Sequence, residues 1–257
     1  MLLVEARNIT KAFGGLMALE GVDIAIGTQE IVGLIGPNGA GKSTCVNVLS
    51  GYYKATSGQT IFAGEDITKL NLYQTARRGL VRSFQHAFNF KEFTVLENTI
   101  IGQHLSGRPG IFHGLFMLPS YRRKEREVER KAEEMLEFAG LWHVRNERAG
   151  ELPYGYQKLL GMAVAASANP KVLLLDEPVA GMNAGETDQA MDLVKRMRSE
   201  RGMSILLIEH NVRAIMGVCD RIVVLNFGKK IADGTPQEVS QNKAVIDAYL
   251  GDEVYVA

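Results

Sequence analysis

The sequence predicts an α/β fold whose central β-sheet is mainly parallel. Three continuous apolar runs, at residues 29–36, 171–177 and 203–210, read QEIVGLIG, KVLLLDE and MSILLIEH. Strands that are buried on both faces of a parallel sheet have this pattern, because helices cover both sides of such a sheet. The segment between the second and third runs has helical periodicity, so these two strands and the helix form a βαβ unit.

The helix of this unit has clear start and stop signals. Asn183 is the expected N-cap, Glu186 three residues later completes a capping box, and Gly202 marks the end of the helix. Four apolar residues fall on the helical face that we expect to be buried: Ala190, Leu193, Val194 and Met197. Farther along, RIVVLNFGKKIADG predicts two strands that are joined at residues 226–228 as a hairpin.

The composition indicates a globular chain without a strong net charge. Of the 257 residues 46% are hydrophobic, and 29 Lys and Arg residues balance 29 Asp and Glu residues, which argues against nucleic acid as a partner. The first residues do not resemble a signal peptide, and no apolar run approaches the roughly 20 residues of a spanning helix. We therefore expect a soluble, cytoplasmic protein, with Cys45 and Cys219 as buried apolar residues.

A helical insertion is expected within the α/β core. Residues 121–140 carry charges of both signs and predict a helix with one solvated face, whose apolar side is formed by Val128, Ala132, Met135, Leu136 and Ala139. We expect a discontinuous α/β core at residues 1–85 and 166–235, a mostly helical insertion at residues 86–165, and a C-terminal helical extension at residues 236–257. In the extension, a short helix (242–250) is expected to end at Gly251.

A phosphate-binding motif directly follows the first apolar run. Residues 36–44 read GPNGAGKST and match the P-loop pattern GxxxxGK[ST] at Gly36, Gly41, Lys42 and Ser43. Glycine accepts positive φ values and close approach, so the loop can turn its amides toward a phosphate, and the helix beginning near Lys42 adds its N-terminal amides. Lys42 is expected to reach the β- and γ-phosphates, and the Ser43 hydroxyl to bind Mg²⁺. The fold is therefore expected to be a P-loop NTPase core with a mainly parallel sheet, an antiparallel β portion and an inserted helical subdomain.

Acidic residues and a histidine end the other two runs. Asp176 is placed to hold Mg²⁺ through water, and Glu177 can orient or deprotonate the attacking water beside the γ-phosphate. Two adjacent carboxylates at the end of a buried strand cost desolvation energy unless a cation compensates them. His210 ends the third run. Ligands collect at the carboxyl ends of strands in open α/β sheets, so we expect Gly36, Asp176 and His210 at one edge, with His210 contacting the γ-phosphate or the water.

With these motifs in their order and spacing, the chain resembles the nucleotide-binding subunit of ABC transporters over essentially its whole length. The resemblance implies that Phe13, in KAFGG, stacks on adenine. It implies that Gln85, in RSFQH, links the metal site to the helical subdomain, which faces the transporter. It also identifies Asp176 as the Mg²⁺ aspartate, Glu177 as the catalytic glutamate and His210 as the switch histidine.

The expected site therefore uses ATP and Mg²⁺ and comprises three sets of residues. The catalytic residues are Glu177, His210 and Gln85. The Mg²⁺ ligands are Ser43, Gln85 and Asp176. The nucleotide-binding residues are Phe13, Gly36, Pro37, Asn38, Gly39, Ala40, Gly41, Lys42, Ser43, Thr44, Tyr154 and Gly155.

Two motifs depart from the pattern of the family. The signature, usually LSGGQ, is LPYGYQ at residues 152–157. Gly155 matches the second signature glycine, whose amide meets the γ-phosphate across a head-to-tail dimer in this family. Pro153 replaces the serine and has neither a hydroxyl nor an N–H, and Tyr156 stands at the usual glutamine position. Asn183 stands where aspartate is usual, in the loop that crosses the dimer interface.

Several short segments resemble one branch of the family. They are FGG (13–15), GLF (114–116), LPYG (152–155), AGMN (180–183) and the short C-terminal helix. That branch contains ATP-binding subunits of importers for branched-chain and other hydrophobic amino acids. The implied function is transport-coupled ATP hydrolysis at the inner face of the cell membrane. The implied partners are membrane permease subunits, a second ATP-binding subunit in a homo- or heterodimer and, indirectly, an extracytoplasmic binding protein.

Other functions remain open from the sequence. Similar motifs would serve a urea or amide importer, a lipid exporter, a soluble ABC ATPase of translation or DNA repair, or a nucleotide-sensing scaffold that does not hydrolyse ATP. Two interpretations of the surface that meets the membrane partner are also compatible with the sequence. Phe88, Phe90 and Phe93, with residues 105–121 nearby, either line a groove for that partner or form the core of the helical subdomain.

Overall fold

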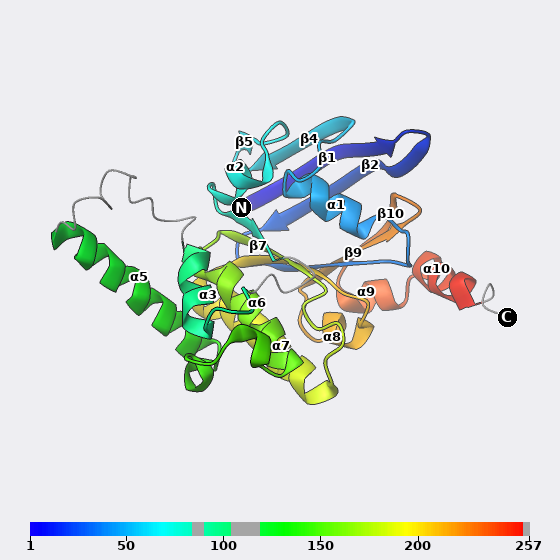
Figure 1. The fold of residues 1–257 in the computed structure, drawn as a ribbon. Helices are drawn as coiled ribbons and strands as arrows, with labels where there is room; N and C mark the ends of the chain where they lie inside the picture. Colours follow the sequence, from blue (N-terminus) through cyan, green and yellow to red (C-terminus); the bar gives the residue numbers. More distant parts are fainter. Residues whose placement is uncertain (84–89, 104–118, 254–257) are drawn as a thin grey trace. The chain divides into compact units, whose positions relative to one another are not determined.

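The computed structural model describes residues 1–83, 90–103 and 119–253, which divide into two compact units (Figure 1). The first unit comprises Met1–Arg82 and Lys171–Ala257, and the second comprises Ser83–Pro170. Within the described ranges, no helix has the length and apolar character that crossing a bilayer requires.

Two β-sheets form the frame of the first unit. One is antiparallel, with the strand order β2-β1-β4-β5. The other has the order β10-β9-β3-β8-β7-β6, and all of its strand pairs are parallel except β10 with β9. The strands are β1 (Leu2–Phe13), β2 (Leu16–Gly27), β3 (Ile31–Ile35), β4 (Ser57–Phe62), β5 (Glu65–Asp66), β6 (Leu80–Arg82), β7 (Val172–Asp176), β8 (Ser204–Ile208), β9 (Arg221–Asn226) and β10 (Lys229–Gly234).

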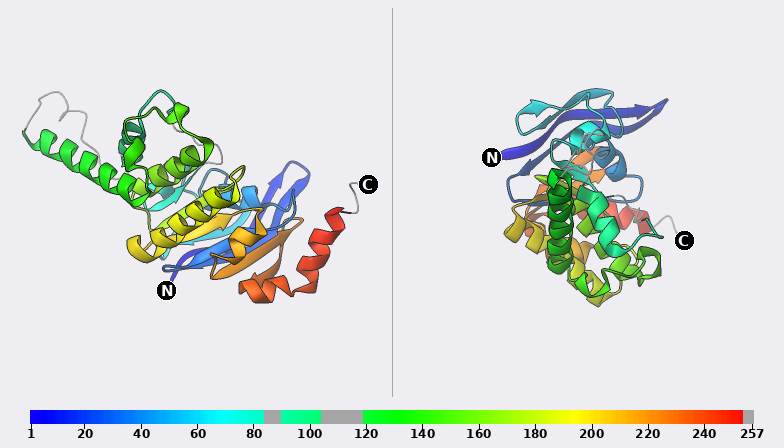
Figure 2. Two further views of the ribbon diagram at one scale, coloured as in Figure 1. Left: turned by 90° about the horizontal axis from the view of Figure 1, so that it is seen from below. Right: turned by 60° about the vertical axis from the view of Figure 1, so that its left-hand side comes forward.

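Helices connect the strands of the first unit. They are α1 (Lys42–Leu49), α2 (Leu72–Ala76), α7 (Ala184–Arg201), α8 (Val212–Met216), α9 (Pro236–Ser240) and α10 (Lys243–Glu253). Figure 2 shows α9 and α10 beside the hairpin that β9 and β10 form, and both helices contact β10. The predicted hairpin is thus confirmed.

The last helix does not end where the sequence predicts. The expected end at Gly251 was wrong, because the helix continues to Glu253. One glycine inside a helix costs only about 1 kcal/mol and does not by itself stop the helix.

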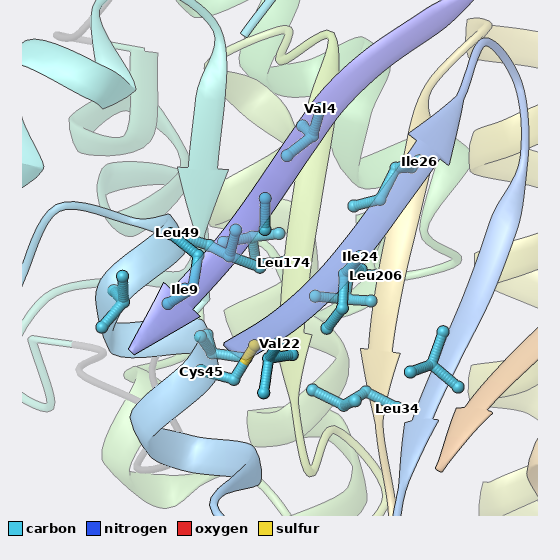
Figure 3. Packing of buried hydrophobic residues seen from close by; sticks show 14 of the residues in the cluster. Val4, Ile9, Val22, Ile24, Ile26, Leu34, Cys45, Leu49, Leu174 and Leu206 are labelled. Carbon is cyan, nitrogen blue, oxygen red and sulfur yellow. The ribbon is translucent and has the colours of Figure 1, made fainter. Parts of the chain in front are cut away.

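The hydrophobic core of the first unit joins the two sheets to α1 (Figure 3). Residues from both sheets and from α1 form one buried cluster, which includes Val4, Ile9, Val22, Ile24, Ile26, Leu34, Cys45, Leu49, Leu174 and Leu206. Burial raises the pKa of the Cys45 and Cys219 thiols to about 12, so both remain protonated. Both cysteines are therefore buried apolar residues, as the sequence predicts.

Local sequence signals account for the two ends of α7. Asn183 accepts a hydrogen bond from the Glu186 amide in a capping box, and Gly202 ends the helix in the left-handed region.

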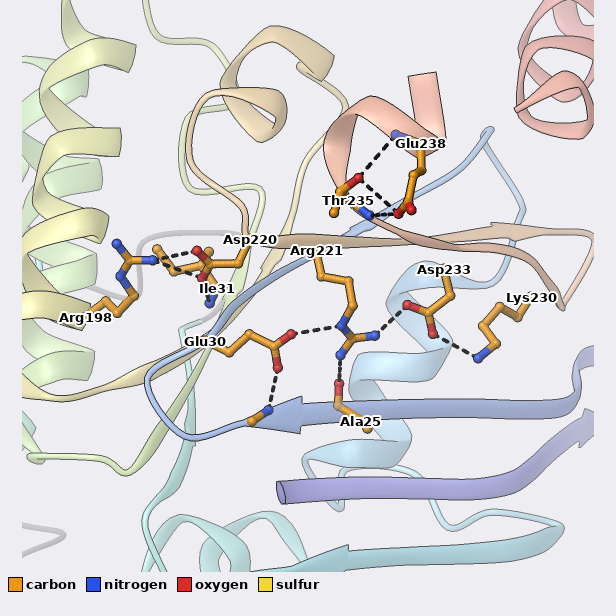
Figure 4. Close-up of polar contacts among 11 residues, drawn as sticks. Ala25, Glu30, Ile31, Arg198, Asp220, Arg221, Lys230, Asp233, Thr235 and Glu238 are labelled. Atoms are coloured by element: carbon orange, nitrogen blue, oxygen red, sulfur yellow. Dashed lines mark hydrogen bonds and ion pairs between the residues drawn. The ribbon is translucent and has the colours of Figure 1, made fainter. Parts of the chain in front are cut away.

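Figure 4 shows two arginines whose ion pairs connect elements of the first unit. Arg198 pairs with Asp220 at 2.7 Å, and Arg221 Nε lies 2.8 Å from Glu30 Oε1. Arg221 also pairs with Asp233, so one guanidinium connects β9, β10 and the residue before β3.

The described part of the second unit is mostly helical. It contains α3 (Val95–Gly102), α5 (Pro119–Phe138), α6 (Tyr154–Ser167) and two 3₁₀ turns, η2 (Trp142–Val144) and η3 (Ala149–Glu151). Helix α3 packs against α5 and α6. At Gly102 a Cβ atom would lie 2.3 Å from the Val164 carbonyl oxygen, so glycine permits the close approach of α3 to α6. The predicted apolar face is confirmed for Ala132, Met135 and Leu136 in α5 and for Ala139 just after it, which are buried, whereas Val128 is half-buried. On the opposite face, exposed Lys131 pairs with Glu127 at 2.8 Å.

Leu206 provides a test of the core that supports the sheet edge. Its side chain is fully buried in the middle of β8, between β3 and β7. Leu206→Ala should lower the free energy of unfolding by about 2–5 kcal/mol, because it removes buried apolar area and leaves a cavity. Leu16→Ala, at a position that is 67% exposed, is the control and should change stability by less than about 0.5 kcal/mol. Equal losses in chemical denaturation of the two variants would contradict this view of the core.

Candidate functional site

Three loops leave the six-stranded sheet at one edge. The strands β3, β8 and β7 are parallel neighbours, and their register pairs Leu34 with Ile208 and Ile208 with Asp176. The segments that follow these strands contain the P-loop, His210 and Glu177 in turn. The parallel register therefore brings together three chain segments that are far apart in the sequence.

The P-loop has a backbone that its glycines permit. Gly36, Gly39 and Gly41 have φ values of 150°, 77° and 102°. A Cβ atom on Gly36 would lie 2.1 Å from the Leu225 carbonyl oxygen, and one on Gly41 would lie 2.7 Å from the Ala18 carbonyl oxygen. At both positions, neighbouring backbone leaves no room for a side chain.

Lys42 is held inside the loop by the chain itself. Its ammonium donates hydrogen bonds to the carbonyl oxygens of Gly36, at 2.7 Å, and Pro37, at 2.8 Å. Helix α1 begins at Lys42, and among the described residues no side chain caps this end of the helix. The amides of the first helical turn, which include those of Ser43 and Thr44, have no acceptor within the helix. The loop thus presents amides and an ammonium group in one place, as an anion-binding site requires.

An aromatic pair lies at the end of β1, on the strand pair that contacts the P-loop. Phe13 ends β1 and is 40% exposed, and its ring meets Tyr53 edge-on with centroids 5.2 Å apart. Lys11 Nζ lies 4.7 Å from the centroid of the Phe13 ring. Phe13 pairs with Leu16 across the turn into β2, and Ala18, two residues later, lies against Gly41 of the P-loop. An accessible ring near the phosphate loop can stack on a base.

Asp176 is buried at the end of β7 and pairs with Arg82. Asp176 Oδ2 accepts a hydrogen bond from Arg82 Nη2 at 2.7 Å, and the Asp176 side chain is only 2% exposed. Its other oxygen, Oδ1, is buried and has no hydrogen-bond partner in the part of the chain that the structure describes. A buried carboxylate oxygen in this state fits a site for Mg²⁺ or for a water bound to Mg²⁺, because Mg²⁺ prefers oxygen ligands.

Glu177 and His210 are in direct contact. His210 Nε2 lies 2.8 Å from Glu177 Oε1, which is the length of a hydrogen bond. The Glu177 amide donates to the Ile208 carbonyl oxygen at 2.9 Å, and Glu177 has a φ of 49°, which is uncommon for a residue with a side chain. The backbone here is therefore fixed by the neighbouring strand, and it holds the carboxylate against the imidazole.

Glu209 is a residue of this site that the sequence analysis missed. It lies between Ile208 and His210, is 3% exposed, and its Oε1 accepts a hydrogen bond from the Val179 amide at 2.8 Å. Burial raises the pKa of Glu209, and the nearby Glu177 charge acts in the same direction, while backbone hydrogen bonds oppose both effects. An acidic residue at the end of an apolar run was a usable signal, since the same signal identified Glu177.

The signature segment lies in the second unit. Pro153 precedes α6, and among the described residues no side chain caps this helix end. Tyr154 is 52% exposed, and Lys158 Nζ lies 5.6 Å from the centroid of its ring. Pro153 lacks an N–H but lies outside the helix, so the amides of Tyr154 and Gly155 remain in its first turn.

Several expected residues lie outside the described residues. They are Gln85, Phe88 and nearly all of the segment 105–121. Asn183 is described, and its side chain caps α7 within the same chain. Asparagine therefore has a structural role at this position, which helps to explain why it can stand where aspartate is usual.

The raised pKa of Glu209 predicts a pH dependence of stability. An acid whose pKa is higher in the folded state favours folding at low pH, and this contribution is lost as the pH rises above about 4.5. The thermal midpoint of Glu209→Gln should therefore improve relative to wild type as the pH rises through this range. Glu137→Gln, at an exposed position, controls for the loss of a carboxylate. A Glu209→Gln difference that stays constant, or that favours wild type with rising pH, would contradict the assignment.

Comparisons with known proteins agree with this geometry. Residues 19–180 match the family described as ABC transporter, and residues 229–255 match the one described as branched-chain amino acid ATP-binding cassette transporter. BraF of Pseudomonas aeruginosa, a high-affinity branched-chain amino acid transport ATP-binding protein, is 42% identical over 97% of this chain and 98% of its own length. LivG of Escherichia coli K12, a protein with the same description, is similar to the same extent.

Solved structures show the same fold. An ATP-binding cassette of an ABC transporter in its ADP conformation has a TM-score of 0.85 and 35% identity, over 98% of this chain and 99% of that chain. A nucleotide-free cassette has a TM-score of 0.84 and 35% identity, over 97% of this chain and 99% of that chain. The predicted P-loop NTPase fold is thereby confirmed, and the chain belongs to the family of ABC transporter ATP-binding proteins.

Proposed function

We propose that the chain is the ATP-hydrolysing subunit that powers a membrane importer for branched-chain or other hydrophobic amino acids. Family membership makes it an ABC-type ATPase. The match of its C-terminal residues to the branched-chain amino acid group supports this substrate class over urea, amides or lipids, as do relatives at 42% identity. The observation that carries the hydrolytic part is the contact between Glu177 and His210, at the sheet edge that also bears the P-loop.

The P-loop binds the phosphates of ATP. The amides of residues 38–44 and the N-terminus of α1 surround the phosphate oxygens, and the Lys42 ammonium exchanges the carbonyls of Gly36 and Pro37 for them. Phe13 stacks on the adenine. Ser43 and Asp176, with Gln85 by resemblance, would hold Mg²⁺, and the buried Oδ1 of Asp176 supports this assignment. Mg²⁺, when bound, neutralises charge on the phosphates.

Glu177 and His210 prepare the attack on the γ-phosphate. The Glu177 carboxylate orients a water molecule and accepts its proton as the water oxygen attacks the γ-phosphorus. The bond from this phosphorus to the oxygen that bridges to the β-phosphate breaks, and ADP leaves with that oxygen. The hydrogen bond from His210 fixes the position of this carboxylate and places the imidazole where it can contact the γ-phosphate. Removal of the γ-phosphate then changes what the site can bind.

A second ATP-binding subunit completes the site in a head-to-tail dimer. The N-terminus of α6 in one subunit presents the amides of Tyr154 and Gly155 to the γ-phosphate held by the other subunit. Pro153 removes the serine hydroxyl of the usual signature but none of these amides. ATP thus holds the two subunits together, and hydrolysis allows them to separate.

The permease subunits contact an aromatic surface on the second unit. Phe90 and Phe93 are 54% and 44% exposed, and their rings stack with centroids 5.5 Å apart. Their exposure favours a docking surface over the alternative in which these two residues form the core of the subdomain. Through this surface the subunit is held at the cytoplasmic face of the membrane.

Glu177→Gln tests the catalytic assignment. The variant should bind Mg·ATP as wild type does, because glutamine keeps the shape, and its rate of phosphate release should fall by about 100-fold or more. Lys42→Ala should instead weaken nucleotide binding itself, and exposed Lys195→Ala should change neither property. Unchanged hydrolysis by Glu177→Gln, measured together with the paired subunit, would refute the role of Glu177 as the base.

Phe90→Ala and Phe93→Ala test the membrane-facing surface. Each variant should keep its ATPase activity without permeases and should lower solute uptake by the assembled transporter, because the docking surface is lost. Tyr73→Ala removes an aromatic residue that is 49% exposed in the first unit and should leave uptake intact. Normal uptake by both phenylalanine variants would remove this surface from the proposal.

A further inference from the structure

Arg82 occupies an unusual position beside the expected magnesium site. It ends the edge strand β6, and its side chain is only 9% exposed. Its Nη2 donates to Asp176 Oδ2 at 2.7 Å, and its Nη1 donates to the side-chain oxygen of Asn47. A buried arginine in contact with a buried carboxylate compensates a charge that would otherwise be costly to desolvate.

The two partners of Arg82 lie on the two elements that carry the expected Mg²⁺ ligands. Asn47 follows Ser43 by one turn on α1, so both residues lie on the same face of the helix. Asp176 ends β7. The planar guanidinium therefore connects the helix of the hydroxyl ligand to the strand of the carboxylate ligand, and its fixed geometry sets their separation.

The two carboxylate oxygens of Asp176 have different surroundings because Arg82 binds only one of them. Oδ2 is bound to the guanidinium, whereas Oδ1 is buried without a hydrogen-bond partner among the described residues. The ion pair thus fixes the rotation of the carboxylate and leaves one oxygen for a further ligand. Groups that orient a metal ligand in this way commonly affect metal affinity about 10–100-fold.

We infer that Arg82 is a positioning residue for the magnesium site, which holds Asp176 so that Oδ1 is available to Mg²⁺ or to its bound water. The inference rests on the proposed function for the identity of the cation. Arg82 belongs neither to the P-loop nor to the catalytic pair, so its role at the site is additional to theirs. The alternative is that the ion pair only stabilises the fold.

The test measures ADP affinity by calorimetry on the full chain, in EDTA and in a series of Mg²⁺ concentrations. Arg82→Met should leave the affinity in EDTA unchanged and weaken the Mg²⁺-dependent gain about 10-fold or more. Arg82→Lys keeps the charge without the fork and should give an intermediate loss. Arg198→Met, which breaks an arginine–aspartate pair elsewhere in the first unit, should leave the Mg²⁺ response as in wild type.

A second comparison tests whether Arg82 acts through Asp176. Asp176→Asn and the double variant Arg82→Met with Asp176→Asn should have the same Mg²⁺ response, because the group that Arg82 orients is already altered. If Arg82→Met alone does not fold, the comparison of Asp176→Asn with the double variant still tests the inference. The double variant is expected to fold because Asp176→Asn removes the carboxylate that would be left without a compensating charge. A further loss of the Mg²⁺ response in the double variant would overturn the inference.

The outcomes separate this inference from the proposed function. If wild type shows no ADP binding and no Mg²⁺-dependent gain, the proposed nucleotide site itself is refuted. If wild type responds to Mg²⁺ and folded Arg82→Met responds equally, the role of Arg82 is refuted and the ion pair is only structural.

Discussion

The parallel alignment of β3, β8 and β7 is the constraint on which the site depends. Leu34, Ile208 and Asp176 lie level across three hydrogen-bonded strands, so the loops that follow them leave the sheet at the same edge. Every residue of these three strands is buried, so a register shift of one residue would exchange side chains between two packed faces and disrupt both. The same burial that stabilises the sheet therefore also fixes the positions of the phosphate loop, the carboxylates and the histidine.

Each of the three acidic side chains at this edge has a partner within the chain. Asp176 is paired with Arg82, Glu177 contacts His210, and Glu209 accepts a backbone hydrogen bond from Val179. Three acidic groups so close together would repel one another if they were left without partners. Each partner also connects a carboxylate to a different element or loop, so these contacts hold the parts of the site together.

Local sequence signals were sufficient for part of this structure. The buried strands, the P-loop and α7 follow from apolar runs, glycine spacing and the caps Asn183 and Gly202, all of which act within a few residues. Individual strands of the antiparallel sheet were not located, because β1 and β2 have several register shifts, and Asn8 in β1 has a φ of 51°. Arg82 escaped notice because its partner lies 94 residues away. A pair of that kind has no periodicity in the sequence, and only the parallel sheet brings it together.

A crystal structure of the chain with Mg·ADP would show whether the loop at residues 36–44 binds the phosphates of a nucleotide together with Mg²⁺. We expect the β-phosphate to lie against the amides of this loop and near Lys42. We expect the cation to lie beside the Ser43 hydroxyl and the Asp176 carboxylate, directly or through water. A nucleotide bound elsewhere, or a loop that still holds Lys42 on its own carbonyls while saturated with Mg·ADP, would contradict this expectation.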